Sequence, residues 1–164
     1  LVLEADHILL QGQPAADALE AYRALAMTLS SAETLGATQA ALDTTVDYTK
    51  QRVQFGQPLA SFQALQHRMS NMLIQTELTR SLIYAACNAA DSGCDDAARF
   101  ARAAKVKATT VGRKVSQEAI QLHGGIATTD EYIVGHFFKR ITALESWVCS
   151  KGEALKEFMA LSPS

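Results

Sequence analysis

Two short polar segments contain the side chains of this chain that are best suited to hold a ligand. Residues 52–59 read RVQFGQPL, and residues 121–125 read QLHGG. The guanidinium of Arg52 offers a fork of donors to oxyanions such as phosphate, and the amide of Gln121 can both donate and accept at a nucleobase edge. The glycines let the backbone approach a bound molecule closely. The two segments therefore indicate a site for a large polar ligand held between helices.

Each of these residues also has a purely structural interpretation. Arg52 falls at the end of a helical pattern, where the helix dipole favours a cation. Phe55 beside a glycine is typical of a turn anchor, and His123 is typical of a packed or capping residue. The pair Gly124 and Gly125 is weak evidence for phosphate binding, because no strand precedes it as in dinucleotide-binding folds. The residue types alone leave both interpretations open.

A long helical pattern leads into the first segment. Apolar residues recur at steps of three and four from Asp17, a candidate N-cap, to about Arg52. The expected buried face of this helix consists of Tyr22, Leu25, Leu29, Ala32, Leu35, Gln39, Leu42 and Val46. A helix much longer than the usual length of about 12 residues requires long partner helices.

The rest of the chain supplies three such partners. One helix is expected to end near Gly93, and the next to run from Asp95 to the glycine pair. The last is expected over residues 134–161, where Gly135 and Gly152 are candidate interruptions. Short corners between long helices predict an all-α fold, an up-down-up-down four-helix bundle with long antiparallel helices. The bundle would comprise residues 16–164, and residues 1–15 would form a short extended arm.

Composition narrows the classes of function. The formal net charge is −2, so no basic stripe suggests nucleic acid, and no apolar run is long enough to span a membrane. The three cysteines lack metal-like spacing and indicate reduced thiols of a cytoplasmic protein. The four histidines show no paired spacing, so no metal site is expected. The chain begins without methionine, which indicates a fragment of a longer protein.

Taken together, these segments resemble the C-terminal helical domain of the acyl-CoA dehydrogenase family. The likeness extends over residues 20–145 and runs through AETLG at 32–36, YTKQRVQFGQPL at 48–59, FQALQH at 62–67, QLHGGI at 121–126 and TDEY at 129–132. Residues 1–10 are similar to the last strand of the β domain that precedes this domain in the family. The resemblance therefore implies that the chain is the C-terminal piece of a larger enzyme.

The resemblance also implies FAD as the cofactor, bound across a subunit interface. Arg52, Gln54 and Phe55 match family positions that reach the FAD diphosphate and the adenosine side. Gln121 and Gly125 match positions at the adenine half, and Gly124 beside them is also expected to contact the cofactor. The two segments would then serve FAD from different subunits. The bundle would also build the interfaces of a dimer or tetramer, or pair with a related unlike subunit.

The catalytic base is the main departure from the family pattern. In the family, a glutamate removes the α-proton of an acyl-CoA thioester while hydride passes to FAD. The two positions where members carry that glutamate fall here on Val148 and Ala26, whose side chains cannot accept a proton. Glu145 precedes Val148 by about one helical turn and is the candidate base.

The leading hypothesis is the C-terminal domain of a FAD-dependent acyl-CoA dehydrogenase, which performs α,β-dehydrogenation of an acyl-CoA thioester. This domain would contribute FAD contacts and oligomer interface. Two alternatives stay open: a base-less FAD-binding partner subunit of a heteromeric dehydrogenase, and a helical interaction module without a cofactor. The chain alone is expected to be inactive, because the domain that holds the flavin ring and the substrate is absent.

Overall fold

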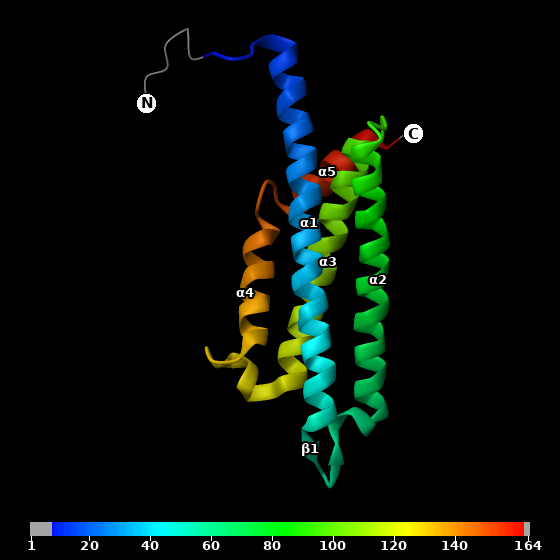
Figure 1. The fold of residues 1–164 in the computed structure, drawn as a ribbon, viewed down its shortest axis with the longest axis vertical. Coiled ribbons are helices and arrows are strands. Elements are labelled where there is room, and N and C mark those ends of the chain that lie inside the picture. The colour runs from blue at the N-terminus through cyan, green and yellow to red at the C-terminus, as the bar shows by residue number, and fades with distance from the viewer. Residues whose placement is uncertain (1–7, 163–164) are drawn as a thin grey trace.

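The computed structural model describes residues 8–162, which fold almost entirely into helices (Figure 1). Five α-helices follow one another: α1 at Gly12–Gln51, α2 at Gln63–Asp91, α3 at Ala97–His123, α4 at Ile133–Glu145 and α5 at Lys151–Leu161. The corners contain a two-stranded antiparallel hairpin and two 3₁₀ helices: β1 at Val53–Gln54, β2 at Gln57–Pro58, η2 at Leu59–Ser61 and η3 at Gly124–Thr128. The predicted all-α class is confirmed.

The long helices α1 and α3 lie side by side at the centre, with α2 on one flank and α4 on the other (Figure 1). In this view α1 and α3 descend while α2 and α4 ascend, and α5 packs across the upper part of α3. Helices α1 and α3 therefore run in the same direction and end at the same end of the molecule. This shared direction brings together the two chain segments that follow these helices.

The predicted last helix is in fact two helices, α4 and α5, joined by a turn. The break falls at residues 146–150 and not at Gly135 or Gly152, each of which lies in the first turn of a helix. Val148 has a left-handed backbone with φ 71°, which cannot continue α4, and Ser150 starts α5 through a capping box with Glu153. The fourth long helix of the predicted bundle is therefore replaced by a short α4 and the crossing helix α5.

The first helix begins earlier than predicted. It starts at Gly12, so residues 12–15 belong to α1 and not to an arm, and Asp17 lies inside the helix. Pro14 fits in the first turn, because the amides there have no partner within the helix. Residues 1–7 lie outside the described part of the chain. The expected relation of residues 1–10 to a preceding β domain therefore stays a prediction.

The buried face of α1 is rich in hydroxyl side chains, which differs from the prediction. Tyr22, Leu25 and Leu29 are 68%, 50% and 60% exposed. The hydroxyl of Thr38 donates to the carbonyl of Thr34 at 2.7 Å, one turn earlier, and most other buried threonines of α1 do the same. Because such a hydroxyl is satisfied within its own helix, it can be buried at little cost. The buried positions include Met27, Ser31, Thr34, Thr38, Ala41, Leu42, Thr45 and Thr49.

The helices are tightly packed where α3 passes α1 and α4. A β-carbon added to Gly112 of α3 would lie 2.8 Å from Cγ2 of Thr34 and 3.1 Å from Cγ2 of Ile141. Glycine is therefore the residue that allows this three-helix contact. An apolar cluster extends from here towards the ends of α1 and α3, and it includes Ala41, Leu42, Met72, Val111, Val115, Ala119, Leu122 and Val134.

Candidate functional site

The two polar segments predicted from the sequence meet in one cleft. Its volume is about 400 Å³, and its lining consists of Tyr48, Arg52, Gln54, Leu59, Gln121, Leu122, His123, Gly124, Gly125 and Ile126. The segments meet because α1 and α3 run in the same direction, so the residues that follow them lie at one end of the molecule (Figure 1). One copy of the chain presents both segments, which differs from the expectation that they act from different subunits.

The first wall of the cleft is the end of α1 together with the hairpin. Arg52 is the C-cap residue of α1, and its amide donates to the carbonyl oxygen of Tyr48 at 2.8 Å. The carbonyl oxygen of Arg52 accepts from the amide of Leu59 at 2.8 Å, which closes the hairpin onto the helix end. The Arg52 side chain is exposed, and it forms no ion pair within residues 8–162. The wall thus presents a cation that no carboxylate of the described chain neutralises.

Phe55 occupies the tip of the hairpin in an unfavourable backbone conformation. Phe55 and Gly56 have φ angles of 53° and 80°, as in a type I′ turn, where asparagine and glycine are preferred. Phe55 is 90% exposed, and its ring lies nearly perpendicular to the Phe62 ring with centroids 6.2 Å apart. Among the predicted cofactor contacts, Phe55 is the one that does not line the cleft.

The second wall is the end of α3 and the start of η3. Gly124 ends α3 with φ 67° and ψ −146°, a region of backbone space that is essentially limited to glycine. Gly125 has no positive φ, and a β-carbon added there would meet no atom within 4 Å. Folding therefore requires the first glycine but not the second. Gly125 lines the cleft although folding does not require a glycine there. Its missing side chain lets a ligand approach the backbone closely.

Three rings that the sequence interpretation did not assign to the site join the two walls. Tyr48 of α1 stacks on His123 of α3 with ring centroids 4.3 Å apart and planes 30° apart. The hydroxyl of Tyr48 donates to the backbone carbonyl of His123 at 3.3 Å, and the Tyr132 ring lies 5.0 Å from the His123 ring. A signal was present in the sequence, because Tyr48 precedes Arg52 by about one helical turn and His123 directly precedes the glycine pair.

His123 is buried, and its surroundings favour the neutral imidazole. Its side chain is 4% exposed, and Nδ1 donates to the carbonyl oxygen of Ala119 at 2.8 Å. Nε2 is buried and has no hydrogen-bond partner among the described residues. Burial lowers the pKa of His123, and the hydrogen bond to Ala119 opposes part of that shift. Burial and the carbonyl acceptor at Nδ1 therefore both favour a neutral imidazole with its proton on Nδ1.

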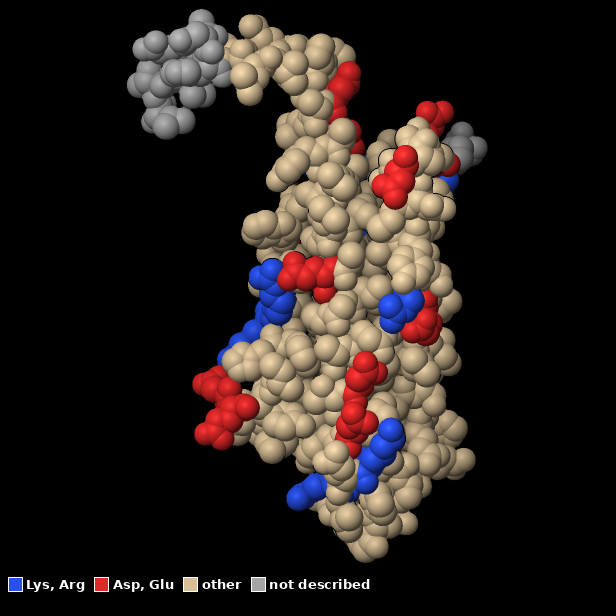
Figure 2. Space-filling model, viewed as in Figure 1, with Lys and Arg blue, Asp and Glu red and all other residues tan. Residues whose placement is uncertain are grey.

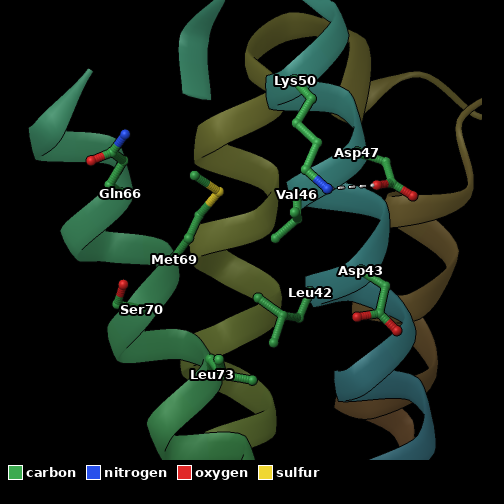
Figure 3. Close-up of a pocket in the computed structure, with 9 residues that line it drawn as sticks. All are labelled: Leu42, Asp43, Val46, Asp47, Lys50, Gln66, Met69, Ser70 and Leu73. Carbon is green, nitrogen blue, oxygen red and sulfur yellow. Dashed lines mark ion pairs between the residues drawn. The ribbon is translucent and has the colours of Figure 1, made fainter. Parts of the chain in front are cut away.

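A second hollow, of about 550 Å³, lies between α1 and α2 (Figure 3). Its lining includes the apolar side chains of Leu42, Val46 and Met69. On its rim, Lys50 pairs with Asp47, with 3.5 Å between the ammonium and carboxylate atoms (Figure 3). The cation that lines this groove is therefore already paired, unlike Arg52 in the cleft.

The two positions expected for a catalytic base lie away from the cleft. Ala26 lines a groove of about 340 Å³ between α1 and α4. Glu33 and Arg140 line the same groove and pair at 2.6 Å. Val148 lies in the α4–α5 turn and packs against the buried cluster that contains Met27. Both positions are apolar, so neither provides a proton acceptor.

Glu145 is the last residue of α4 and contacts α3. Its carboxylate pairs with Arg113 at 2.6 Å, and it does not line the α1–α4 groove. The neighbouring turn is held by the buried Lys105, whose ammonium donates to the carbonyl oxygens of Leu144 at 2.7 Å and Trp147 at 2.9 Å. The assignment of Glu145 as a base stays a prediction.

The surface carries charges of both signs. On the face shown in Figure 2, basic and acidic side chains lie near one another, and no area of one sign dominates. Within residues 8–162, no group of at least three His, Cys, Asp or Glu side chains is arranged to hold a metal ion. In the same part of the chain, no helix has the length and apolar character that crossing a membrane requires.

Known proteins are similar in sequence to most of this chain. The family described as acyl-CoA dehydrogenase, C-terminal domain, matches residues 18–148. The acyl-CoA dehydrogenase IpdE2 of Mycolicibacterium smegmatis is 40% identical over 115 residues, which are 70% of this chain and 35% of that protein. The chain thus spans little more than a third of the length of such curated relatives.

Solved structures share the arrangement of the helices. Butyryl-CoA dehydrogenase from Megasphaera elsdenii matches with a TM-score of 0.79 at 31% identity, over 82% of this chain and 35% of that one. The Tcur3481–Tcur3483 steroid ACAD matches with a TM-score of 0.80 at 32% identity, over 84% of this chain and 38% of that one. Because the family match also includes both walls of the cleft, the chain belongs to the acyl-CoA dehydrogenase family, in its C-terminal domain.

Proposed function

We propose that the cleft binds the adenosine diphosphate half of FAD, in a protein that α,β-dehydrogenates an acyl-CoA thioester. The observation that carries this proposal is the meeting of Arg52, Gln121 and the glycine pair in one cleft of about 400 Å³. That volume lies in the usual range of small-molecule sites, about 300–1,000 Å³. When bound, FAD supplies a flavin ring that accepts hydride. The residues of this chain bind and position the other end of the cofactor.

The residues of the cleft fit this ligand group by group. The exposed guanidinium of Arg52 suits the diphosphate, because its planar fork of donors matches phosphate oxygens. The helix C-termini expose carbonyl oxygens with partial negative charge, which suit donors such as ribose hydroxyls and the adenine amine. Gln54 and Gln121 can satisfy both donors and acceptors of the nucleoside. Gly125 leaves space for close backbone approach.

Phe55 supports self-association of the protein. Its backbone is held in the left-handed region while its ring is 90% exposed, so the hairpin displays a large apolar group at a conformational cost. Strain of this kind is typically maintained for function. In this proposal the ring packs against a second copy in a dimer or tetramer, or against a related unlike subunit.

A second candidate is a FAD-binding subunit without a base of its own. Two observations favour it: both expected base positions, Ala26 and Val148, are apolar, and the carboxylate of Glu145 pairs with Arg113 at 2.6 Å. In this case the proton acceptor belongs to an unlike subunit. In the first candidate, Glu145 leaves Arg113 and acts as the base.

Visible absorption spectroscopy of the full-length parent protein, purified under gentle conditions that retain a bound flavin, tests both candidates. A visible flavin band is expected, and its absence would favour a helical interaction module without a cofactor. Bleaching of the flavin by a panel of acyl-CoA thioesters tests dehydrogenation. The variant Glu145→Gln tests the base, because retained turnover excludes Glu145. The 164-residue chain alone is expected to show no turnover, and measurable turnover would contradict that expectation. The cytoplasmic location stays a prediction.

A further inference from the structure

His123 connects the two walls of the cleft through contacts with separate elements. Its ring stacks on Tyr48 of α1 at 4.3 Å, and its backbone carbonyl accepts from the Tyr48 hydroxyl at 3.3 Å. The ring of Tyr132, which follows η3, covers the imidazole at 5.0 Å. Within α3, Nδ1 donates to the carbonyl oxygen of Ala119 at 2.8 Å. One residue therefore fixes the end of α1 relative to the glycine pair that follows it.

The site of His123 accommodates one imidazole proton only. A carbonyl oxygen can only accept, so the contact with Ala119 places the proton on Nδ1 and leaves a lone pair on Nε2. Nε2 is buried without a partner among the described residues. A second proton there would create a buried donor with no acceptor and a charge with no counter-ion, and both are costly away from water.

The groups around His123 do not compensate such a charge. From α1 it faces the phenol of Tyr48, and from the segment after η3 it faces the phenol of Tyr132. The charged side chain of the cleft lining is that of Arg52, a cation, which cannot act as a counter-ion for an imidazolium. Within residues 8–162, no carboxylate pairs with His123. The α3 helix contributes only the Ala119 carbonyl, which Nδ1 already uses in the neutral form.

We propose that neutral His123 is the positioning residue that holds the two walls of the cleft at their binding separation, and that protonation of Nε2 separates them. The imidazolium must reach water, so it leaves the stack on Tyr48, and the hydrogen bond between the Tyr48 hydroxyl and the His123 carbonyl is lost. The wall with Gly124 and Gly125 then moves independently of the wall with Arg52. A ligand that contacts both walls is released as the pH falls. The identity of that ligand rests on the proposed function, whereas the movement of the walls does not.

Amide hydrogen exchange of the free 164-residue chain tests the movement of the walls. The amides of Arg52, Leu59 and Gly124 donate within the walls, to the carbonyls of Tyr48, Arg52 and Ile120. These bonds close the helix ends, which open more often once the contact between the walls no longer packs them. We expect the protection factors of these amides, corrected for intrinsic exchange, to fall between about pH 6.5 and about pH 5, because burial lowers the pKa of His123 below its ordinary value. The fall should share its midpoint with the NMR titration of the His123 imidazole. Protection that stays constant while His123 titrates would overturn the inference.

Two matched variants test whether His123, and not another titrating group, causes the pH-dependent loss of protection. His123→Phe keeps a ring on Tyr48 but cannot be protonated, so its walls should stay protected at both pH values. The control His67→Phe removes an exposed histidine of α2 and should behave as the wild type does. If His123→Phe does not fold, the wild type still tests the inference, because its loss of amide protection and its His123 titration must share one midpoint. The same loss of protection in a folded His123→Phe variant would overturn the inference.

Titration with FAD links the movement to ligand binding. We expect the affinity of the wild type to fall about tenfold per pH unit below the His123 midpoint, because only the neutral form is competent. The affinity of His123→Phe should change much less. Absence of FAD binding at every pH would refute the proposed function while the protection factors still decide the role of His123. A pH-independent affinity in the wild type would overturn the coupling proposed here.

Discussion

The hydroxyl of Tyr48 donates to the backbone carbonyl of His123 at 3.3 Å, across a separation of 75 positions in the chain, and the two rings stack at 4.3 Å. This contact joins the C-terminal ends of α1 and α3. It therefore turns two separate helix ends into the two walls of one cleft. A ligand that contacts both walls would depend on this junction as much as on the residues that it touches.

The buried imidazole of His123 makes stability depend on pH. Its pKa in the folded chain lies below the ordinary value, mainly because of burial, so the unfolded chain binds the proton more readily. The resulting stability is complete above about pH 6.5 and decreases as the pH falls below it. We expect the free energy of unfolding of the wild type to fall relative to that of His123→Phe between about pH 6.5 and pH 5, as measured by urea denaturation. Parallel curves for the two proteins would contradict the buried neutral state.

Lys105 is expected to stabilise the turn between α4 and α5. The variant Lys105→Met removes two charge-assisted hydrogen bonds, to Leu144 and Trp147, and leaves a buried carbonyl without this donor. The expected loss is about 1–3 kcal/mol of unfolding free energy. The exposed Lys114 provides the control, and Lys114→Met should leave the urea midpoint nearly unchanged. Equal midpoints for the two variants would show that the turn does not depend on Lys105.

Alanine substitutions at two glycines in helix interiors should change the stability of the fold in opposite directions. Gly112→Ala places a β-carbon 2.8 Å from Thr34, so we expect a loss of about 1–3 kcal/mol through overpacking. Gly36→Ala places a β-carbon where no atom lies within 4 Å, so α1 should gain about 0.5–1 kcal/mol through reduced backbone freedom. Thermal unfolding of both variants measures the difference. A stable Gly112→Ala would show that α1, α3 and α4 are packed less tightly than described.

Alanine substitutions at the two adjacent glycines of the cleft should have different effects, one on stability and the other on FAD binding. Gly124 has φ 67° and ψ −146°, so Gly124→Ala is expected to cost about 1–3 kcal/mol of stability. Gly125→Ala meets no atom within 4 Å, so its stability should be unchanged while its affinity for FAD falls. The measurements are urea denaturation and FAD titration of both variants. Undiminished FAD binding by Gly125→Ala would remove the argument for close backbone approach at this position.

The sequence predicts the helical class and most helix ends, because the relevant signals are local. Gly93 and Gly124 have positive φ angles at the ends of α2 and α3, as their positions after apolar runs indicate. The start of α1 was predicted too late, because Pro14 looks like a helix breaker although the first turn tolerates proline. The break before α5 was missed because a left-handed Val148 carries no glycine signal.

Other features depend on tertiary structure and escape local patterns. The buried face of α1 cannot be recognised from apolar periodicity, because it contains the polar residues Thr34 and Thr38. Their hydroxyls can be buried because they donate to carbonyl oxygens within the helix. The family resemblance implies that Arg52 and Gln121 bind one ligand, and the shared direction of α1 and α3 places them in one cleft of one copy. The role of His123 required knowledge that its Nε2 is buried without a partner.

The most direct test of the account compares FAD binding by Arg52→Ala and Lys50→Ala in fluorescence titrations. Both variants remove one cation from the last part of α1, but Arg52 lines the cleft whereas Lys50 lines the α1–α2 groove and pairs with Asp47. Loss of a charge-assisted contact worth about 1.5–3 kcal/mol predicts that Arg52→Ala binds FAD about 10- to 100-fold more weakly, while Lys50→Ala binds as the wild type does. Wild-type affinity in Arg52→Ala would contradict the assignment of the cleft to the FAD diphosphate.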